Sequence, residues 1–141
     1  MFVDQIELET KEYIDFYIIT REIEKIVNKS QIKNGVVTVV TKHTTTAITV
    51  NEALECLQSD IELFLSNLVT EDSSYSHARM LRNYGSTAGN PTGHIKSLLI
   101  GNHCHFILVD GQIIKGDAQD VFFCEFDGPS TRTVMVSIEE K

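Results

Sequence analysis

The sequence has few basic residues and no long apolar run, and each shortage argues against a class of protein. Lys and Arg number 12 against 20 Asp and Glu, which gives a formal net charge of −8. That sign opposes binding to nucleic acid, because Lys and Arg supply most of the affinity for a phosphate backbone. No apolar run approaches the roughly 20 residues that cross a bilayer, and the first residues show no secretory signal pattern. We therefore expect a cytoplasmic protein that binds neither nucleic acid nor membranes.

Cysteine is also scarce. Cys56, Cys104 and Cys124 are odd in number and widely spaced, so no two of them have the spacing of a zinc knuckle. Each lies in an apolar stretch of the chain. We therefore expect three reduced thiols in the core of a protein from a reducing compartment.

Length and composition predict one globular domain spanning residues 1–141. Apolar residues make up 42% of the chain and charged residues 23%, which is a typical balance for such a domain. No repeat, low-complexity stretch or linker divides it. A chain of this length buries roughly two-thirds of its unfolded surface, enough for a core without disulfides.

Hydrophobic periodicity predicts an α+β fold. Val, Ile and Thr dominate 36–50, which is typical of strands, and His43 interrupts them. Apolar residues recur at steps of three and four across 54–68, as in an amphipathic helix. Asn90-Pro91 predicts a helix start and Asp110-Gly111 a hairpin turn. Short strands at both ends, with helices between them, predict a single compact domain with a largely antiparallel sheet. Two strands are expected within residues 1–19, one more on each side of His43, and one each at 105–109, 121–126 and 133–138. Helices are expected after a cap at Thr20, at 54–68 and at 91–100.

Three of the five histidines lie in positions suited to metal binding. His43 interrupts a strand, His77 lies in a long polar loop, and His94 lies in the first turns of a helix, where imidazolium is disfavoured. Three neutral imidazoles can hold a divalent transition metal with one position open, as in catalytic sites. Spacing alone leaves open that they are ordinary core or surface histidines. For His103 and His105 we expect only packing and strand-edge hydrogen bonds.

The C-terminal strands predict a contact between two opposite charges. A hairpin turn centred on Gly128-Pro129 would place Glu125 opposite Arg132, each at the end of an apolar strand face. One interpretation is a structural ion pair at the rim of the core. The other is an acid/base or metal-ligating Glu beside a phosphate-binding Arg. The residue pattern does not decide between them.

Further polar side chains admit two interpretations each. Asp60 and Asn51 are either boundary residues or anchors for a metal or a substrate. Thr44, Thr45 and Thr46 either follow strand propensity or offer hydroxyl and backbone N–H groups to an anion.

An ordered set of short segments runs through the chain. They are His43-Thr44-Thr45, Ala47-Ile48-Thr49, Asn51-Glu52, Asp60, Tyr75 with His77, His94-Ile95-Lys96-Ser97 with Gly101, Gly111, Gly116, Gln119, and Cys124-Glu125-Phe126-Asp127-Gly128-Pro129 with Arg132. In this order and spacing they resemble the YjbQ-like family, the group named for a secondary thiamine-phosphate synthase activity. The resemblance covers essentially the whole chain.

The resemblance implies a homotrimer and a divalent metal near His43, His77 and His94. The metal would be zinc or another transition metal, or magnesium arriving with the substrate. It also implies slow synthesis of thiamine phosphate from an aminopyrimidine diphosphate and a thiazole phosphate, with release of pyrophosphate. The metal would neutralise the leaving diphosphate. The other implied site residues are Glu125, Arg132 and Asp60 as catalytic groups, and Thr44, Thr45, Asn51 and Arg132 for the phosphorylated substrate.

Two departures from the family pattern predict a changed substrate or a lower rate. The family usually has Gly-Thr-Trp-Gln where this chain has Gly116-Asp117-Ala118-Gln119, and the chain has no Trp at all. Ser130 stands where an Arg is common. The first change removes an aromatic ring and adds a carboxylate, and the second removes a positive charge.

The sequence therefore leaves three function classes open. The first is the metal-dependent transferase. The second is a metal-dependent hydrolase of a phosphorylated or ester substrate, with Glu125 as base. The third is a non-catalytic, metal-binding trimer that binds a ligand.

Overall fold

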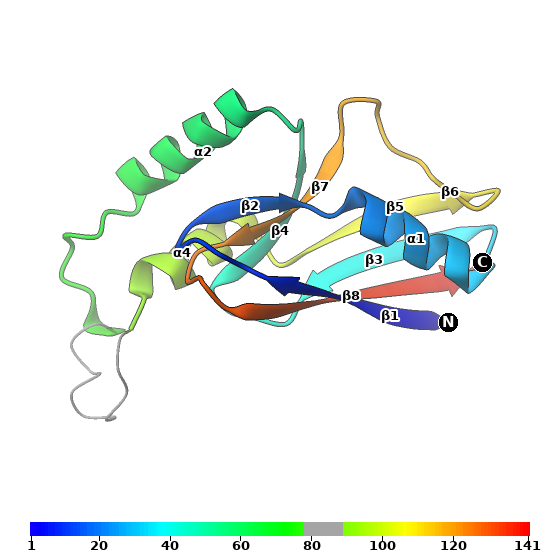
Figure 1. Cartoon of the computed structure of the whole chain (residues 1–141), viewed down its shortest axis with the longest axis horizontal. Coiled ribbons are helices and arrows are strands. Elements are labelled where there is room, and N and C mark those ends of the chain that lie inside the picture. The colour runs from blue at the N-terminus through cyan, green and yellow to red at the C-terminus, as the bar shows by residue number, and fades with distance from the viewer. Residues whose placement is uncertain (78–88) are drawn as a thin grey trace.

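Two antiparallel sheets make up most of the structure, a computed structural model that describes residues 1–77 and 89–141 (Figure 1). The strands are β1 (Phe2–Glu9), β2 (Asp15–Ile18), β3 (Gly35–Thr41), β4 (Thr46–Asn51), β5 (His103–Val109), β6 (Gln112–Ile113), β7 (Asp120–Glu125) and β8 (Thr131–Glu140), and the helices are α1 (Thr20–Ser30), α2 (Glu55–Leu68) and α4 (Pro91–Ile100). One sheet has the strand order β1-β8-β3-β5-β6 and the other β2-β7-β4. The predicted α+β fold is therefore confirmed.

The main core lies between the two sheets. Val39 of β3 and Val136 of β8 meet Ile48 of β4 and Phe123 of β7 there, and all four are buried. Helix α1 joins this core through its apolar face, where Ile23 is fully buried. Alternation of side chains along each strand puts these apolar residues on the inward face.

A second apolar cluster covers the opposite face of the smaller sheet. The cluster contains every second residue from the middle of β7 to just beyond its end, namely Phe122, Cys124 and Phe126. Leu65 of α2 packs against them. Ile100, the last residue of α4, is a partly buried member. Strand β7 is therefore buried on both faces, so the charged group at its end, Glu125, lies inside the protein.

The predicted hairpin between the last two long strands is wrong. Strand β7 pairs with β2 and β4, whereas β8 pairs with β1 and β3, so the two lie in different sheets. The segment through Gly128 carries the chain from one sheet to the other. Both strands were predicted correctly, but their pairing partners lie 69 (Asn51 and Asp120) to 136 (Phe2 and Ile138) residues away in the sequence, beyond the reach of a local pattern.

The predicted cap of α1 is also wrong. The N-cap position is Ile19, which has no side-chain cap bond, and Thr20 is the first helical residue. The Thr20 hydroxyl instead donates to Asp120 Oδ1 (2.7 Å) and accepts from the Val121 N–H (2.9 Å). Thr20 therefore ties α1 to the start of β7.

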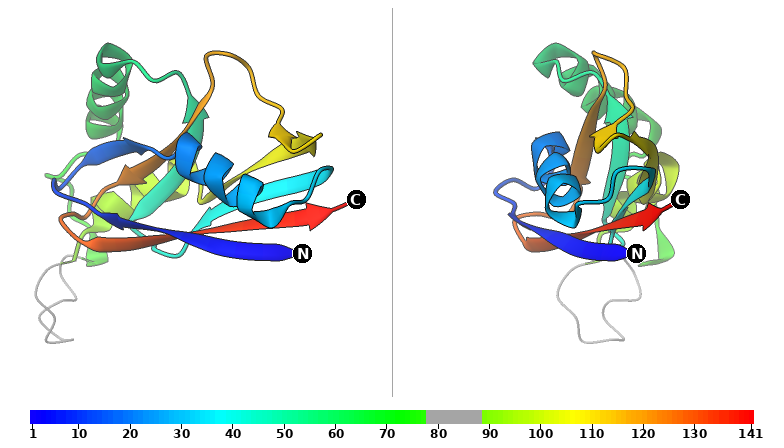
Figure 2. Two further views of the ribbon diagram at one scale, coloured as in Figure 1. Left: turned by 45° about the vertical axis from the view of Figure 1, so that its right-hand side comes forward. Right: turned by 90° about the vertical axis from the view of Figure 1, so that its right-hand side faces the viewer.

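Helix α2 lies at the periphery of the molecule in the views of Figure 1 and Figure 2, and it packs on the smaller sheet through Leu65. Its predicted apolar stripe is only partly covered: Leu65 is buried, but Phe64 and Leu68 are 65% and 58% exposed. Helix α2 thus presents an uncovered apolar face. Among the described residues, no helix is long and apolar enough to span a membrane.

The cysteines are all unpaired, as expected, but only two of them belong to the interior. Burial raises the pKa of the Cys124 thiol to about 12 and that of the half-buried Cys104 to about 11. Cys56 is exposed on α2, so its predicted core position is wrong.

Candidate functional site

A tight turn between β3 and β4 positions the first predicted site residue, His43. The hydroxyls of Thr41 and Thr46 lie 2.6 Å apart and close the turn from its two ends. The His43 N–H donates to Thr41 Oγ1 (3.3 Å), and Thr46 Oγ1 donates to the His43 carbonyl (3.0 Å). The Thr-rich sequence here therefore fixes the turn as well as the strands.

The His43 ring takes the place of a missing ladder hydrogen bond. The β3–β8 ladder ends at Thr41 and Val134, and His43 Nε2 accepts the next N–H of β8, from Thr133, at 2.9 Å. Since an imidazole nitrogen that accepts must be unprotonated, the proton of the neutral ring is on Nδ1. Burial, followed by the positive charge of Arg132, lowers the pKa of His43 below 6.5. The neutral form of the ring is favoured, but its Nε2 lone pair is in use.

Asn90 anchors the helix that carries His94. Its Oδ1 accepts the Gly93 N–H (3.0 Å), which confirms the predicted N-cap. Its Nδ2 donates to the Phe126 carbonyl (2.6 Å), just beyond β7. A side chain at Gly93 would bring its Cβ within 2.9 Å of that carbonyl oxygen, so glycine allows the helix to approach this closely.

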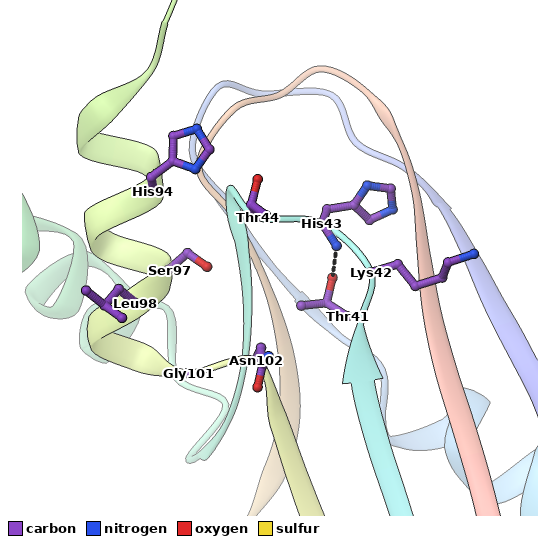
Figure 3. A pocket seen from close by; sticks show the side chains of 9 residues that line it. All are labelled: Thr41, Lys42, His43, Thr44, His94, Ser97, Leu98, Gly101 and Asn102. Atoms are coloured by element: carbon purple, nitrogen blue, oxygen red, sulfur yellow. Dashed lines mark hydrogen bonds between the residues drawn. The ribbon is translucent and has the colours of Figure 1, made fainter. Parts of the chain in front are cut away.

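These two anchored segments form the walls of one cavity of about 600 Å³ (Figure 3). Lys42, His43 and Thr44 line it from the β3–β4 turn, and His94 and Ser97 from α4. In Figure 3 the His94 ring extends towards Thr44, while the His43 ring points towards β8. The volume suits a small molecule, and the lining offers one cation, hydroxyl groups and two imidazoles. The remaining lining residues are Thr41, Leu98, Gly101 and Asn102.

The structure brings together two of the three predicted metal ligands. The ring centres of His77 and His94 lie 5.1 Å apart. With metal–nitrogen bonds of about 2.0–2.1 Å, two imidazoles that share a tetrahedral ion have ring centres roughly 5 Å apart. The His77–His94 separation therefore fits a shared ion. His43 fits less well, because its Nε2 is bonded to Thr133, and no three His, Cys, Asp or Glu side chains among residues 1–77 and 89–141 form a group that could hold a metal.

Glu125 and Arg132 form a buried ion pair beside this cavity without lining it. Arg132 Nε and Nη2 donate to the two Glu125 carboxylate oxygens, each at 2.8 Å. The carboxylate also accepts from Thr10 Oγ1 (2.7 Å) and from the N–H groups of Phe126 and Asp127. The Glu125 carboxylate is saturated inside the protein and Arg132 is buried with it, so the geometry favours the structural interpretation that the sequence left open.

The other predicted residues fall into separate places. Thr44 is exposed at the cavity, whereas Thr45 is buried and accepts a hydrogen bond from Arg132 Nη2 (3.3 Å). Asn51 lines a different, smaller cavity next to α2. Asp60 is exposed on α2. Asn51 and Asp60 therefore do not join the histidines within one chain.

No site role was predicted for four polar lining residues: Thr41, Lys42, Ser97 and Asn102. Lys42 directly precedes the singled-out His43, and Ser97 follows His94 by almost one helical turn, so helical periodicity could have found Ser97. Asn102 belongs to the segment after α4 and has no such local signal. Asp117-Ala118, where the chain departs from the usual family pattern, is exposed between β6 and β7 and does not line this cavity.

Known proteins match the chain over almost its full length. A family model described as UPF0047 protein YjbQ-like matches residues 4–141. The UPF0047 protein of Methanothermobacter thermautotrophicus is 30% identical over 141 residues, which are 100% of this chain and 94% of the relative. The crystal structure of a YbjQ-like protein of unknown function from Sulfolobus solfataricus P2 has a TM-score of 0.89 at 29% identity and covers 99% of this chain and 97% of that one. A yjbq/upf0047 family protein from Clostridium acetobutylicum has a TM-score of 0.86 at 32% identity, with coverage of 96% and 99%.

Proposed function

This chain belongs to the UPF0047, YjbQ-like family, and on that premise we propose that it is a metal-dependent enzyme acting on a phosphorylated small molecule. The observation that carries the proposal is the cavity that Lys42, Thr44 and His94 line. A lysine ammonium and a hydroxyl are suited to bind phosphate oxygens. The reaction that the family resemblance suggests is the transferase reaction that forms thiamine phosphate.

Each group of the cavity has a proposed part in substrate binding. Lys42 holds a phosphate oxygen as a point charge, and the exposed Thr44 hydroxyl donates to a second one. His43 stays neutral, so it adds no positive charge of its own, and it fixes the turn that carries both residues through its bond to Thr133. His77 and His94 would hold a divalent ion, which when bound would neutralise the leaving diphosphate.

The buried ion pair has an indirect part in this proposal. Arg132 reaches Thr45 and Glu125 from β8, so it steadies the residue next to Thr44. Glu125 is fully buried, and hydrogen bonds occupy its carboxylate oxygens. It is therefore poorly placed to act as the base of a hydrolase, and the hydrolase alternative is supported less well than the transferase. A non-catalytic ligand-binding protein is the second candidate, because the same saturation leaves no carboxylate at the cavity.

The proposal also includes a cytoplasmic homotrimer. Unpaired thiols such as Cys56, which is exposed, persist in reducing compartments. The uncovered apolar face of α2 is suited to a contact with a second copy, since large exposed apolar patches are uncommon on monomers.

The test is an assay of the metal-loaded protein with an aminopyrimidine diphosphate and a thiazole phosphate. Formation of thiamine phosphate is expected, with Lys42→Met raising KM for the phosphorylated substrates by roughly tenfold, the loss of one charge-assisted contact. Lys25→Met, an exposed lysine on α1, is the matched control and should behave like the wild type. Release of phosphate without condensation would support the hydrolase. Binding of both substrates without turnover would support the binding protein.

A further inference from the structure

Two histidines on β5 form a pair that the cavity does not use. His103 and His105 lie two residues apart, so they share the outer face of the strand, while Phe106 and Leu108 face the core. Both histidines are exposed, and their ring centres lie 5.0 Å apart. This is the separation, roughly 5 Å, of two imidazoles that ligate one tetrahedral ion.

Hydrogen bonds prepare both rings for ligation through Nε2. His103 Nδ1 lies 2.7 Å from Asn102 Oδ1, and because a carbonyl oxygen only accepts, Nδ1 must carry the proton. The lone pair of the neutral ring is then on Nε2. His105 Nδ1 lies 2.9 Å from the Thr38 hydroxyl of β3, which can accept in the same way. Such second partners orient metal-binding histidines and select their tautomer.

We propose that His103 and His105 bind one divalent transition-metal ion through their Nε2 atoms, with Asn102 and Thr38 as the outer partners. The site is separate from the His77–His94 pair, because it lies on the outer face of the five-stranded sheet. Among the residues that the structure describes, no third His, Cys, Asp or Glu completes a metal-binding group. Water or an outside ligand therefore fills the other positions, and the ion exchanges readily.

The chemistry of the pair selects the kind of metal. Imidazole nitrogens suit Cu²⁺, Ni²⁺ and Zn²⁺, and affinity rises to Cu²⁺ along the divalent series. Mg²⁺ prefers oxygen ligands, so it should not compete. The net charge of −8 favours approach of any cation.

The experiment follows all five histidine ring signals by NMR while Cu²⁺ is added below one equivalent to the full-length protein at pH 7.5. We expect the His103 and His105 signals to broaden together, while the His43 signal is retained. The same titration in His77→Gln/His94→Gln removes the other pair of imidazoles and should leave this broadening unchanged. Equal broadening of all five signals, or loss of the His43 signal first, would overturn the proposal.

Calorimetry with Zn²⁺ in the His77→Gln/His94→Gln background provides the second measurement. Adding His105→Gln should abolish the remaining binding. Thr38→Val, which keeps the shape but removes the outer partner, should weaken it by roughly tenfold or more. Binding that survives His105→Gln would contradict the proposal. Because the background lacks the His77–His94 pair, failure here leaves the proposed active-site metal unaffected.

Discussion

Arg132 and Glu125 are joined by two 2.8 Å hydrogen bonds although their strands belong to different sheets. The pair fastens the end of the three-stranded sheet to the start of β8. Arg132 also reaches Thr45, in the turn that carries His43. The ion pair therefore connects the stability of the fold to the position of the cavity wall.

Replacing Arg132 with Met should destabilise the protein by about 3–5 kcal/mol, because a buried carboxylate loses its counter-ion. Urea unfolding at pH 7.5 measures the change. The double variant Glu125→Gln/Arg132→Met should cost less than Arg132→Met alone, since no unpaired charge is left inside. A change below about 1 kcal/mol for the single variant would mean that the pair is not structural.

The stability of the protein should fall on acidification through His43. Its folded pKa lies below the usual 6.5, so as the pH drops the unfolded chain takes up the proton first. The contribution of His43 is fully present above pH 6.5 and is lost as the pH falls through the folded pKa. His43→Gln retains an acceptor for the Thr133 N–H but does not titrate. The stability advantage of the wild type over this variant should shrink between pH 7.5 and pH 5.5, as measured by urea unfolding. A stability advantage of the wild type that grows on acidification would contradict a lowered pKa of His43 in the folded protein.

Metal retention at the cavity should depend on two histidines rather than three. His77→Gln and His94→Gln should each lower the content of bound divalent ion, because they remove one of two paired imidazoles. His43→Gln should keep it, because its Nε2 is bonded to Thr133. Elemental analysis of protein carrying His103→Gln and His105→Gln in every sample excludes the β5 pair. Equal losses with all three variants would favour the three-histidine site that the sequence predicts.

Phe64→Glu on α2 should dissociate the proposed trimer, because a charge replaces an apolar side chain that is 65% exposed in the single chain. Light scattering across micromolar concentrations measures the mass. Ser66→Glu, an exposed position on the same helix, adds the same charge without removing apolar surface and serves as control. Should Phe64→Glu keep the mass of the wild type, a different surface forms the assembly, and a monomeric wild type would end the prediction of a trimer.

Local features of the fold were predictable from the sequence for a physical reason. The break at His43, the Asn90 cap of α4 and the Asp110-Gly111 hairpin each depend on hydrogen bonds or dihedral preferences within a few residues. Periodicity likewise predicts a strand or a helix from its own side chains. The family pattern added the grouping of His43, Thr44 and His94 around one cavity, which no local signal contains.

The sequence by itself thus determined most strands and helices of this protein, the Asn90 cap and the Asp110-Gly111 turn. It also predicted the contact between Glu125 and Arg132, but from a hairpin that does not form. Only the tertiary structure decided that this contact joins two sheets, that α2 leaves Phe64 uncovered, and that the His43 ring is bonded to Thr133. These outcomes depend on pairings between segments that lie far apart in the chain. Such pairings are selected by the packing of whole sheets, and a pattern within one segment cannot specify its distant partner.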